Sequence, residues 1–306
     1  ESRNPGFVAS GSRVKPGMTE TWNLEPGTLN LAPGTLERFT MLTKEVLPEP
    51  RFQFGKNWTR FLEVLNDDRI ETARASLRFM LGRERLDGLR FLDAGSGSGL
   101  FSLAARTLGA RVHSFDFDPD SVGCTAELRR RYRPDDPDWT VESGSVLDER
   151  YLESLGTFDI VYCWGVLHHT GHMWKGLELI HRRVGPGGTL FIMIYMDRGW
   201  RSSAWRIVKR TYNRGPAAKA LVLLVTIPYF ALRGFLGDVA RFRNPLSHYT
   251  EYGKRRGMSR FHDWIDWIGG YPYEVATRDE IVSFFQSRGF RLEREKYQEY
   301  VLRNDG

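Results

Sequence analysis

Residues 91–99 read Phe-Leu-Asp-Ala-Gly-Ser-Gly-Ser-Gly, and this stretch decides the fold. The residues from Leu89 to Leu92 predict a strand that ends at Asp93, and apolar positions from Leu100 to Leu108 recur at helical spacing. The glycines between them allow a ligand to lie against backbone N–H groups at the start of a helix, where a side chain would block it. The spacing differs from the dinucleotide pattern G-x-G-x-x-G, because position 102 is Ser.

Further strands and helices are expected downstream of this loop. Val112–Asp116 reads as a second strand that ends in an acid, and a carboxylate can accept hydrogen bonds from both hydroxyls of a ribose. A helix with Trp174, Leu177, Ile180 and Val184 on one face is expected to stop at Gly185-Pro186-Gly187-Gly188. The other expected elements are a helix over 119–132 and strands over 139–143, 158–164 and 190–195. This alternation predicts a parallel, doubly wound sheet that binds its ligand at the carboxyl ends of the strands.

In order along the chain, these residues resemble the successive motifs of class I S-adenosylmethionine (SAM) methyltransferases. The motifs are Asp93 with Gly95, Gly97 and Gly99, then Asp116, Phe158-Asp159-Ile160-Val161, Leu167-His168-His169 and Gly185-Pro186-Gly187-Gly188. The resemblance covers roughly residues 70–196 and 278–303. It implies an α/β fold: the doubly wound, Rossmann-like, seven-stranded sheet of this family, with N-terminal helices and a helical cap insertion after strand 5.

The resemblance also implies S-adenosyl-L-methionine as the cofactor and suggests where it binds. The loop Gly95, Ser96, Gly97 and Gly99 would lie against the methionine part, Asp116 would bind the ribose, and Phe117 would flank the adenine. The loop over 144–148 would receive the adenine edge through Ser145 and Val146, although many members carry an acid where this chain has Ser145. Asp93 and Trp164 complete the expected cofactor site. In this family, helices ahead of the first strand often close over the cofactor, which makes Trp58 a weaker candidate.

Five segments are expected along the chain. Residues 1–40 contain four prolines and no periodic apolar pattern, and they predict a flexible tail. N-terminal helices are expected over 41–88, the SAM-binding core over 89–196, a basic and aromatic cap insertion over 197–277, and a helix with an antiparallel strand pair over 278–306. Two cysteines give no disulfide framework, which favours a cytoplasmic protein.

The insertion concentrates positive charge. From Arg198 to Arg260 there are fourteen Lys or Arg and two acids, a net charge of +12 in a chain whose net charge is +6. An anionic membrane, nucleic acid or an anionic substrate would suit this segment, and a solvated helical face is the alternative.

The run Ala220–Phe230 is nearly all apolar, but Pro228 and Arg233 interrupt its extension, so a spanning helix is not expected. We favour a helix buried on the core. The alternative is a helix in a membrane interface, where lipid phosphates would meet the flanking Lys209, Arg210, Arg214, Lys219, Arg241 and Arg243.

Methyl transfer to a hydroxyl needs a group that takes the proton. His169, which follows the fourth strand, is the first candidate. His262 and Glu274 are further candidates, from the segment 257–274, which is dense in aromatic and acidic residues. No metal is expected, because no acids or cysteines stand at ligand spacing from His168-His169-x-x-His172.

The sequence therefore predicts a SAM-dependent methyltransferase for a small-molecule acceptor, at oxygen. Lipid-linked, quinone-like and glycan-type metabolites all remain open as acceptors, and peripheral contact with an anionic inner membrane is a further expectation. One alternative is an RNA methyltransferase that uses the basic insertion, although nucleic acid is less expected because no appended RNA module is recognisable. The other is a SAM-binding regulatory protein without turnover. The oligomeric state is not predicted.

Overall fold

The computed structural model describes residues 58, 62–63, 65–240 and 260–306. The chain divides into two units, Glu1–Pro48 and Glu49–Gly306, and only the second contains described residues. The expected tail over 1–40 and the beginning of the N-terminal helices therefore lie outside the described residues.

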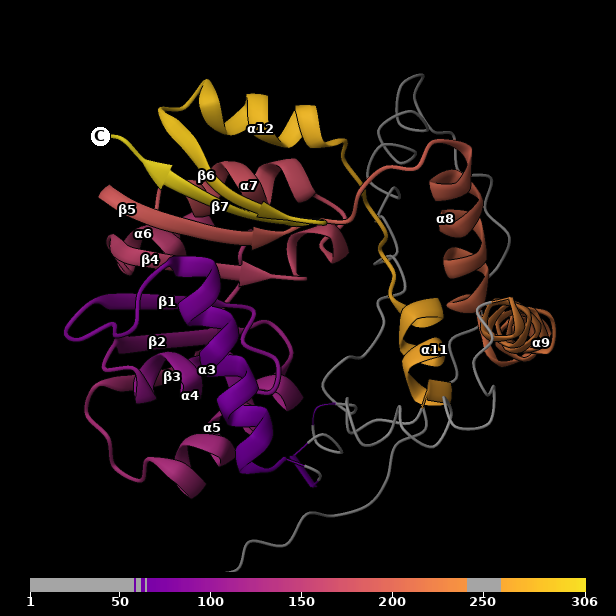
Figure 1. Cartoon of the computed structure of the whole chain (residues 1–306), viewed down its shortest axis with the longest axis horizontal. Helices are drawn as coiled ribbons and strands as arrows, with labels where there is room; N and C mark the ends of the chain where they lie inside the picture. The colour runs from indigo at the N-terminus through magenta and orange to yellow at the C-terminus, as the bar shows by residue number, and fades with distance from the viewer. Residues whose placement is uncertain (1–57, 59–61, 64, 241–259) are drawn as a thin grey trace, which may run out of the picture. The chain divides into compact units, whose positions relative to one another are not determined.

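A seven-stranded sheet forms the centre of the second unit, in the order β3-β2-β1-β4-β5-β7-β6 (Figure 1). Its first five strands pair in parallel, and β7 runs antiparallel to both β5 and β6. The strands are β1 (Arg90–Ala94), β2 (Arg111–Asp116), β3 (Trp139–Ser143), β4 (Phe158–Trp164), β5 (Val184–Met193), β6 (Phe290–Lys296) and β7 (Glu299–Asn304). This mixed sheet confirms the predicted class I methyltransferase fold.

Helices cover both faces of the sheet and bury two apolar cores (Figure 1). Adjacent β1 residues point to opposite faces, so Phe91 belongs to one core and Leu92 to the other. The Phe91 face is covered by α3 (Asp67–Leu81), α4 (Leu100–Thr107) and α5 (Pro119–Tyr132), and the Leu92 face by α6 (Glu149–Ser154), α7 (Met173–His181) and α12 (Arg278–Gln286). Burial on both faces explains why the central strands read as continuous apolar runs.

The expected boundary between α7 and the fifth strand is wrong: the strand was expected over 190–195, but β5 runs from Val184 to Met193 and includes the glycines expected to stop the helix. Val184 was expected on the apolar face of α7, but this helix ends at His181 and Val184 is the first residue of β5. Val184 pairs with Phe158 in the sheet and is buried there. An apolar residue at position 184 suits both the apolar face of the helix and the beginning of a strand. Pairing with β4 places Val184 in the strand.

The described part of the insertion after β5 contains three helices: α8 (Trp200–Tyr212), α9 (Pro216–Val239) and α11 (Arg260–Gly269). They share a small apolar core of their own, centred on Tyr212, Val222 and Ile268. The prediction that the apolar run is buried is wrong for one face of the helix: Leu221 and Leu224 on α9 are 61% and 73% exposed, whereas Val222 is buried. Among the described residues, the stretch Pro216–Leu236 is one helix that is long and apolar enough to cross a membrane, judged by length and composition.

Candidate functional site

The loop between β1 and α4 has a backbone that only glycine adopts readily. Gly95, Gly97 and Gly99 have φ angles of 83°, 55° and 78°, in the left-handed region. A Cβ on Gly95 would lie 2.4 Å from a methyl carbon of Val166, and one on Gly99 would lie 2.9 Å from the Cα of Thr125. Trp58 approaches the loop from the N-terminal segment, because a Cβ on Gly97 would lie 3.0 Å from its indole nitrogen. The loop is therefore a narrow backbone cradle at the start of α4.

Asp116 ends β2 beside this cradle. One of its carboxylate oxygens accepts a hydrogen bond from the N–H of Gly97 at 2.9 Å, and the other accepts from the N–H of Asp118 at 2.9 Å. Burial raises the pKa of Asp116 above its ordinary value. The structure thus brings together the two cofactor elements that the sequence predicts, the glycine loop and the acid at the end of β2. This pairing of a backbone cradle with a carboxylate fits a nucleoside ligand such as SAM.

Asp93 is buried and ends a chain of hydrogen bonds that crosses the sheet. The indole N–H of Trp139 donates to the hydroxyl of Ser114 at 2.9 Å, and the Ser114 and Ser102 hydroxyls lie 2.7 Å apart. The Ser102 hydroxyl donates to the Asp93 carboxylate, so the Ser114 hydroxyl donates to Ser102. Burial raises the pKa of Asp93 to about 7. These donors hold the acid that precedes the glycine loop.

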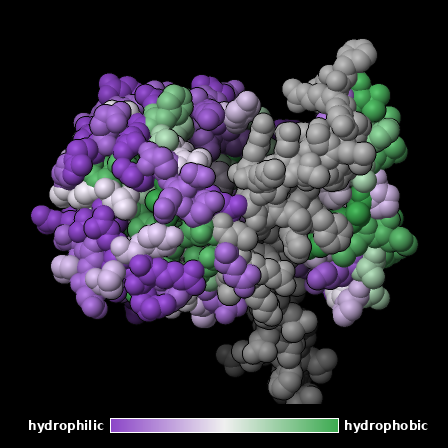
Figure 2. Space-filling view, turned by 60° about the horizontal axis from the view of Figure 1, so that its bottom comes forward, coloured by the Kyte–Doolittle hydropathy of each residue, from purple (hydrophilic) through white to green (hydrophobic). Residues whose placement is uncertain are grey.

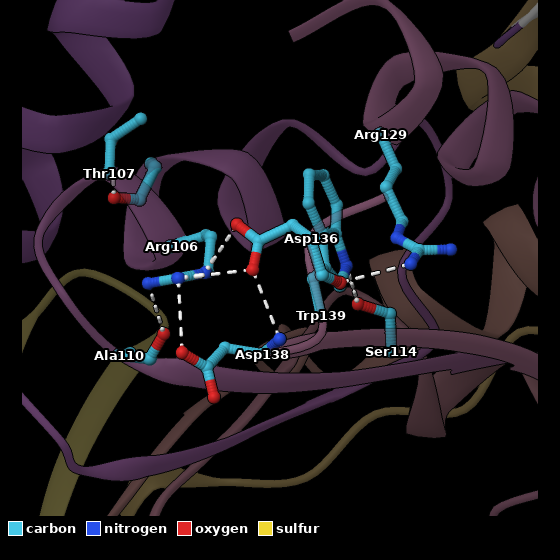
Figure 3. Close-up of polar contacts among 9 residues, drawn as sticks. Arg106, Thr107, Ala110, Ser114, Arg129, Asp136, Asp138 and Trp139 are labelled. Atoms are coloured by element: carbon cyan, nitrogen blue, oxygen red, sulfur yellow. Dashed lines mark hydrogen bonds and ion pairs between the residues drawn. The ribbon is translucent and has the colours of Figure 1, made fainter. Parts of the chain in front are cut away.

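The end of this chain at Trp139 is fixed by charged residues from α4 and α5 (Figure 3). Arg106 donates to both carboxylate oxygens of Asp136, at 2.8 and 3.1 Å, and to Asp138 at 3.2 Å. Arg129 donates to the backbone carbonyl of Asp136 at 3.0 Å. This cluster anchors the turn that leads into β3, and so orients Trp139 toward Ser114.

The expected adenine contacts lie on neighbouring loops. Phe117 directly follows Asp116 and is 65% exposed, as a ring that flanks a ligand would be. The hydroxyl of Ser145 accepts from the N–H of Leu147 at 3.2 Å, and Val146 is buried in the core. The carboxylate of Asp148 accepts from the N–H of Tyr151 at 3.1 Å, which caps α6. Trp164 ends β4, is 40% exposed, and donates through its indole to Glu299 at 2.9 Å.

His169 lies in a short 3₁₀ turn (Leu167–His169) that follows β4. Its Nδ1 lies 2.8 Å from the carbonyl oxygen of Pro272. Because a carbonyl oxygen only accepts, Nδ1 carries the hydrogen and the lone pair is on Nε2. Burial lowers the pKa of His169 to about 4, so its ring is neutral at physiological pH. The ring of His169 meets Tyr195 edge-on at 5.4 Å, and Tyr195 lies 5.5 Å from the ring of Tyr273.

Glu274 belongs to the same loop as Pro272. Both of its carboxylate oxygens accept from the N–H of Met173, at 3.0 and 3.1 Å, so the carboxylate lies at the start of α7. The backbone N–H of Glu274 donates to the carbonyl of His168 at 2.9 Å. The loop of Pro272 and Glu274 therefore packs against the turn of His168 and His169, while the Glu274 carboxylate lies at the start of α7. His262 lies within α11, and its side chain is outside the described residues. Among the described residues, no group of three His, Cys, Asp or Glu is placed to hold a metal.

Lys209 is buried, although the membrane-interface alternative placed it at a lipid surface. Its side chain is fully buried, with Nζ donating to the carbonyl of Trp267. The ammonium nitrogen lies 4.3 Å from the ring centre of Trp267 and 5.0 Å from that of Tyr273. Burial lowers the pKa of Lys209 to about 7. The period of α8 carries a signal for this burial, because Lys209 stands seven residues after Ser202, which is also buried.

Comparisons with known proteins agree with this geometry. A family model described as a methyltransferase domain matches residues 65–296. The chain is 32% identical over 163 residues to the ubiquinone biosynthesis O-methyltransferase of Xanthomonas campestris pv. campestris, a match that covers 53% of this chain and 56% of that protein. It is 28% identical over 202 residues to the enzyme of the same name from Xanthomonas oryzae pv. oryzae, covering 66% of this chain and 70% of the relative. The chain thus spans little more than half of the first relative.

Solved structures include a similar chain, the magnesium protoporphyrin IX methyltransferase of Synechocystis PCC 6803 with bound S-adenosylhomocysteine (SAH). It is 13% identical, with a TM-score of 0.46, and the match covers 81% of this chain and 93% of that one. The family model, by contrast, spans most of the sequence and includes the whole glycine loop, Asp116 and the strands that carry them. The chain therefore belongs to the methyltransferase-domain family and is a class I SAM-dependent methyltransferase.

Proposed function

We propose that this enzyme transfers the methyl group of SAM to a hydroxyl oxygen of a small, quinone-like acceptor. The observation that carries the proposal is the fixed tautomer of His169 at the carboxyl end of β4, where the Pro272 carbonyl holds the hydrogen on Nδ1. The names of the relatives from Xanthomonas, which refer to ubiquinone biosynthesis and O-methylation, support this acceptor class.

The first half of the site would hold the cofactor. SAM, when bound, supplies an electrophilic methyl group on a sulfonium. We propose that the cradle and Asp116 fix its methionine and ribose parts, and that exposed Phe117 flanks its adenine. The full proposed set is Asp93, Gly95, Ser96, Gly97, Gly99, Asp116, Phe117, Ser145, Val146 and Trp164. Rigid binding matters because alignment of the acceptor oxygen with the methyl carbon provides much of the catalysis.

The second half of the site would handle the proton. The acceptor oxygen would bond to the methyl carbon as the bond from that carbon to sulfur breaks, with SAH as the leaving group. The acceptor hydroxyl loses its proton in this step, and we propose that Nε2 of His169 accepts it. The ordinary pKa of a phenolic hydroxyl is about 10, well above the pKa of about 4 of His169, so the proton moves to Nε2 only as methylation of the oxygen lowers the pKa of the hydroxyl. Glu274 and His262 stay candidates, but the Glu274 carboxylate already accepts from the start of α7, which favours a positioning role.

Aromatic side chains around His169 would favour a planar acceptor. The ring of Tyr195 lies next to His169, the ring of Tyr273 packs on Tyr195, and Trp164 ends β4, the strand that leads to the His169 turn. Aromatic pairs prefer offset or edge-to-face contact, so a quinol ring has several partners here. A hydrophobic acceptor of this kind resides in a bilayer, which would place the enzyme in the cytoplasm, at the membrane surface.

The test is methyl transfer from labelled SAM to a panel of catechol and quinol acceptors, with and without a prenyl tail. We expect a methyl ether as the product, identified by mass spectrometry, and a fall in kcat of about 10²–10⁴-fold for His169→Asn with unchanged SAM affinity. His181→Asn is the matched control, since His181 lies within α7 with its Nδ1 on the Leu177 carbonyl. Full activity in His169→Asn, or transfer only to nitrogen or RNA, would contradict the proposal.

A further inference from the structure

Helix α9 exposes a continuous row of large apolar side chains, which we name the α9 outer face. Figure 2 shows apolar residues gathered over this helix at the right-hand edge of the view. At 3.6 residues per turn they fall within an arc of roughly 140°. The α9 outer face consists of Leu221, Leu224, Val225, Tyr229, Leu232, Phe235, Leu236 and Val239, each of which is 48% exposed or more.

The opposite face of α9 attaches the helix to the protein. Val222 is buried in the small core that α9 shares with Tyr212 of α8 and Ile268 of α11. The ring of Phe230 lies 5.7 Å from those of both Trp205 and Trp267. The inner face thus provides the packing that folds the insertion. Apolar helix faces are normally buried, and the outer face is the apolar face of α9 that stays uncovered.

The charged residues of α9 lie outside the outer face. Lys219, Arg233 and Asp238 are the charged residues of α9, and by helical geometry none falls within the arc of the outer face. Arg233 lies at its border and donates to the Tyr229 hydroxyl at 3.3 Å, while Asp238 is buried. Further exposed cations precede the helix: Arg206, Arg210 and Arg214. An apolar strip with cations along one side is typical of helices that bind anionic membrane surfaces.

We propose that α9 is a membrane-docking helix, whose outer face lies in the plane of an anionic bilayer, between its headgroups and acyl chains. The inner face is occupied by α8 and α11, so lipid cannot surround the helix and the helix does not span. Two copies of this chain joined through α9 would bring together two segments of net charge +12, which disfavours a dimer. The proposal does not depend on which acceptor the enzyme methylates.

Vesicle flotation of the full chain tests the proposal. We compare vesicles of phosphatidylcholine alone with vesicles that also contain phosphatidylglycerol. We expect binding to the acidic vesicles that weakens as salt rises, because exposed charges are screened beyond about 10 Å at 0.1 M. Replacing Leu221, Leu224, Leu232 and Leu236 by Gln should lower binding at least tenfold. The matched control is Phe79→Gln with Tyr297→Gln, which removes two exposed rings elsewhere.

A second set of variants tests the charge, and SAM affinity reports that the fold is intact. Arg210→Glu with Arg214→Glu and Lys219→Glu should abolish binding to acidic vesicles while SAM affinity stays unchanged. Equal vesicle binding by the wild type and the four-Gln variant would overturn the proposal. So would resistance of the bound protein to alkaline carbonate, which indicates spanning, or a dimer in sedimentation that the Gln changes dissociate. Binding to bulk tRNA but not to vesicles would overturn it in favour of RNA.

Discussion

The carboxylate of Asp116 accepts a hydrogen bond from the backbone N–H of Gly97, 2.9 Å away and nineteen residues earlier in the chain. This contact joins the end of β2 to the middle of the glycine loop. It positions the acid at the cradle before any ligand arrives. A preformed acceptor beside a preformed backbone loop costs little reorganisation when the cofactor binds.

Gly95→Ala should abolish most SAM binding and lower stability by roughly 1–3 kcal/mol, because the new Cβ would be strained at φ 83° and would overlap Val166. The matched control is Gly88→Ala, where φ is 69° and nothing lies within 4 Å of the new Cβ. The Gly88→Ala variant has the backbone strain but no steric overlap, and it lies outside the glycine loop. Calorimetry and thermal unfolding of both variants separate the two effects. A Gly95→Ala protein that binds SAM like the wild type would show that the loop is not the cofactor cradle.

Asp93 should make stability fall as pH rises from about 4 to about 7. The pKa of its carboxyl is 3.8 in the unfolded chain and about 7 in the fold, so the native state holds a proton that the unfolded state has released. Its stabilising effect is complete below the lower value and is lost above the higher one. Asp93→Asn keeps an oxygen acceptor for Ser102 and should flatten this part of the curve of Tm against pH, whereas Asp120→Asn in the first turn of α5 should not. Parallel curves for Asp93→Asn and the wild type would refute the assignment.

Lys209 should make stability rise with pH between about 7 and 10.5. Burial lowers its pKa from 10.5 to about 7, so in this window the unfolded chain binds the proton and the fold does not. Lys209→Met should remove this rise in the free energy of unfolding. The variant should be most stabilised, relative to the wild type, below pH 7. Lys219→Met is the control, since Lys219 is exposed on α9. Denaturant unfolding at several pH values measures both, and an unchanged rise in Lys209→Met would exclude Lys209 as its source.

Substitutions of Glu274 should affect stability, and substitutions of His169 should affect kcat. Glu274→Ala leaves the start of α7 without its carboxylate and should lower stability by about 1–3 kcal/mol. Glu274→Gln retains an acceptor oxygen and should keep both stability and kcat. His169→Asn should lower kcat with little change in unfolding. If Glu274→Gln loses activity about a hundredfold with its stability intact, then Glu274 is the base and His169 is not.

The sequence predicted those parts of the molecule in which a local pattern has one structural outcome. The backbone of the glycine loop was predictable because alternating glycines between a strand and a helix allow few conformations. The position of Asp116 was predictable because the second expected strand ends at it. The assignment of Val184 to α7 was wrong. Its position suited both the helix and the following strand, and pairing with β4 places it in the strand.

Tertiary packing decided what the sequence could not. The exposure of α9 depends on whether its second apolar face finds a partner, and no local pattern records that. The burial of Lys209 and the hydrogen-bond chain from Trp139 to Asp93 each need residues from three or more elements to meet. Cationic and hydroxyl side chains are usually at the surface, so such contacts appear only once the strands and helices are assembled.

Titration calorimetry with SAM and SAH on the wild type, Asp116→Ala and Asp120→Ala tests the cofactor site most directly. We expect micromolar binding of both ligands to the wild type, on the order of −8 kcal/mol. Asp116→Ala should lose roughly 1.5–3 kcal/mol, a weakening of about 10–150-fold, because a charged hydrogen-bond acceptor at the ribose position is gone. Asp120→Ala, in the first turn of α5, should bind like the wild type. Equal affinities in the two variants, or no heat with either ligand, would contradict a SAM site at Asp116 and the glycine loop.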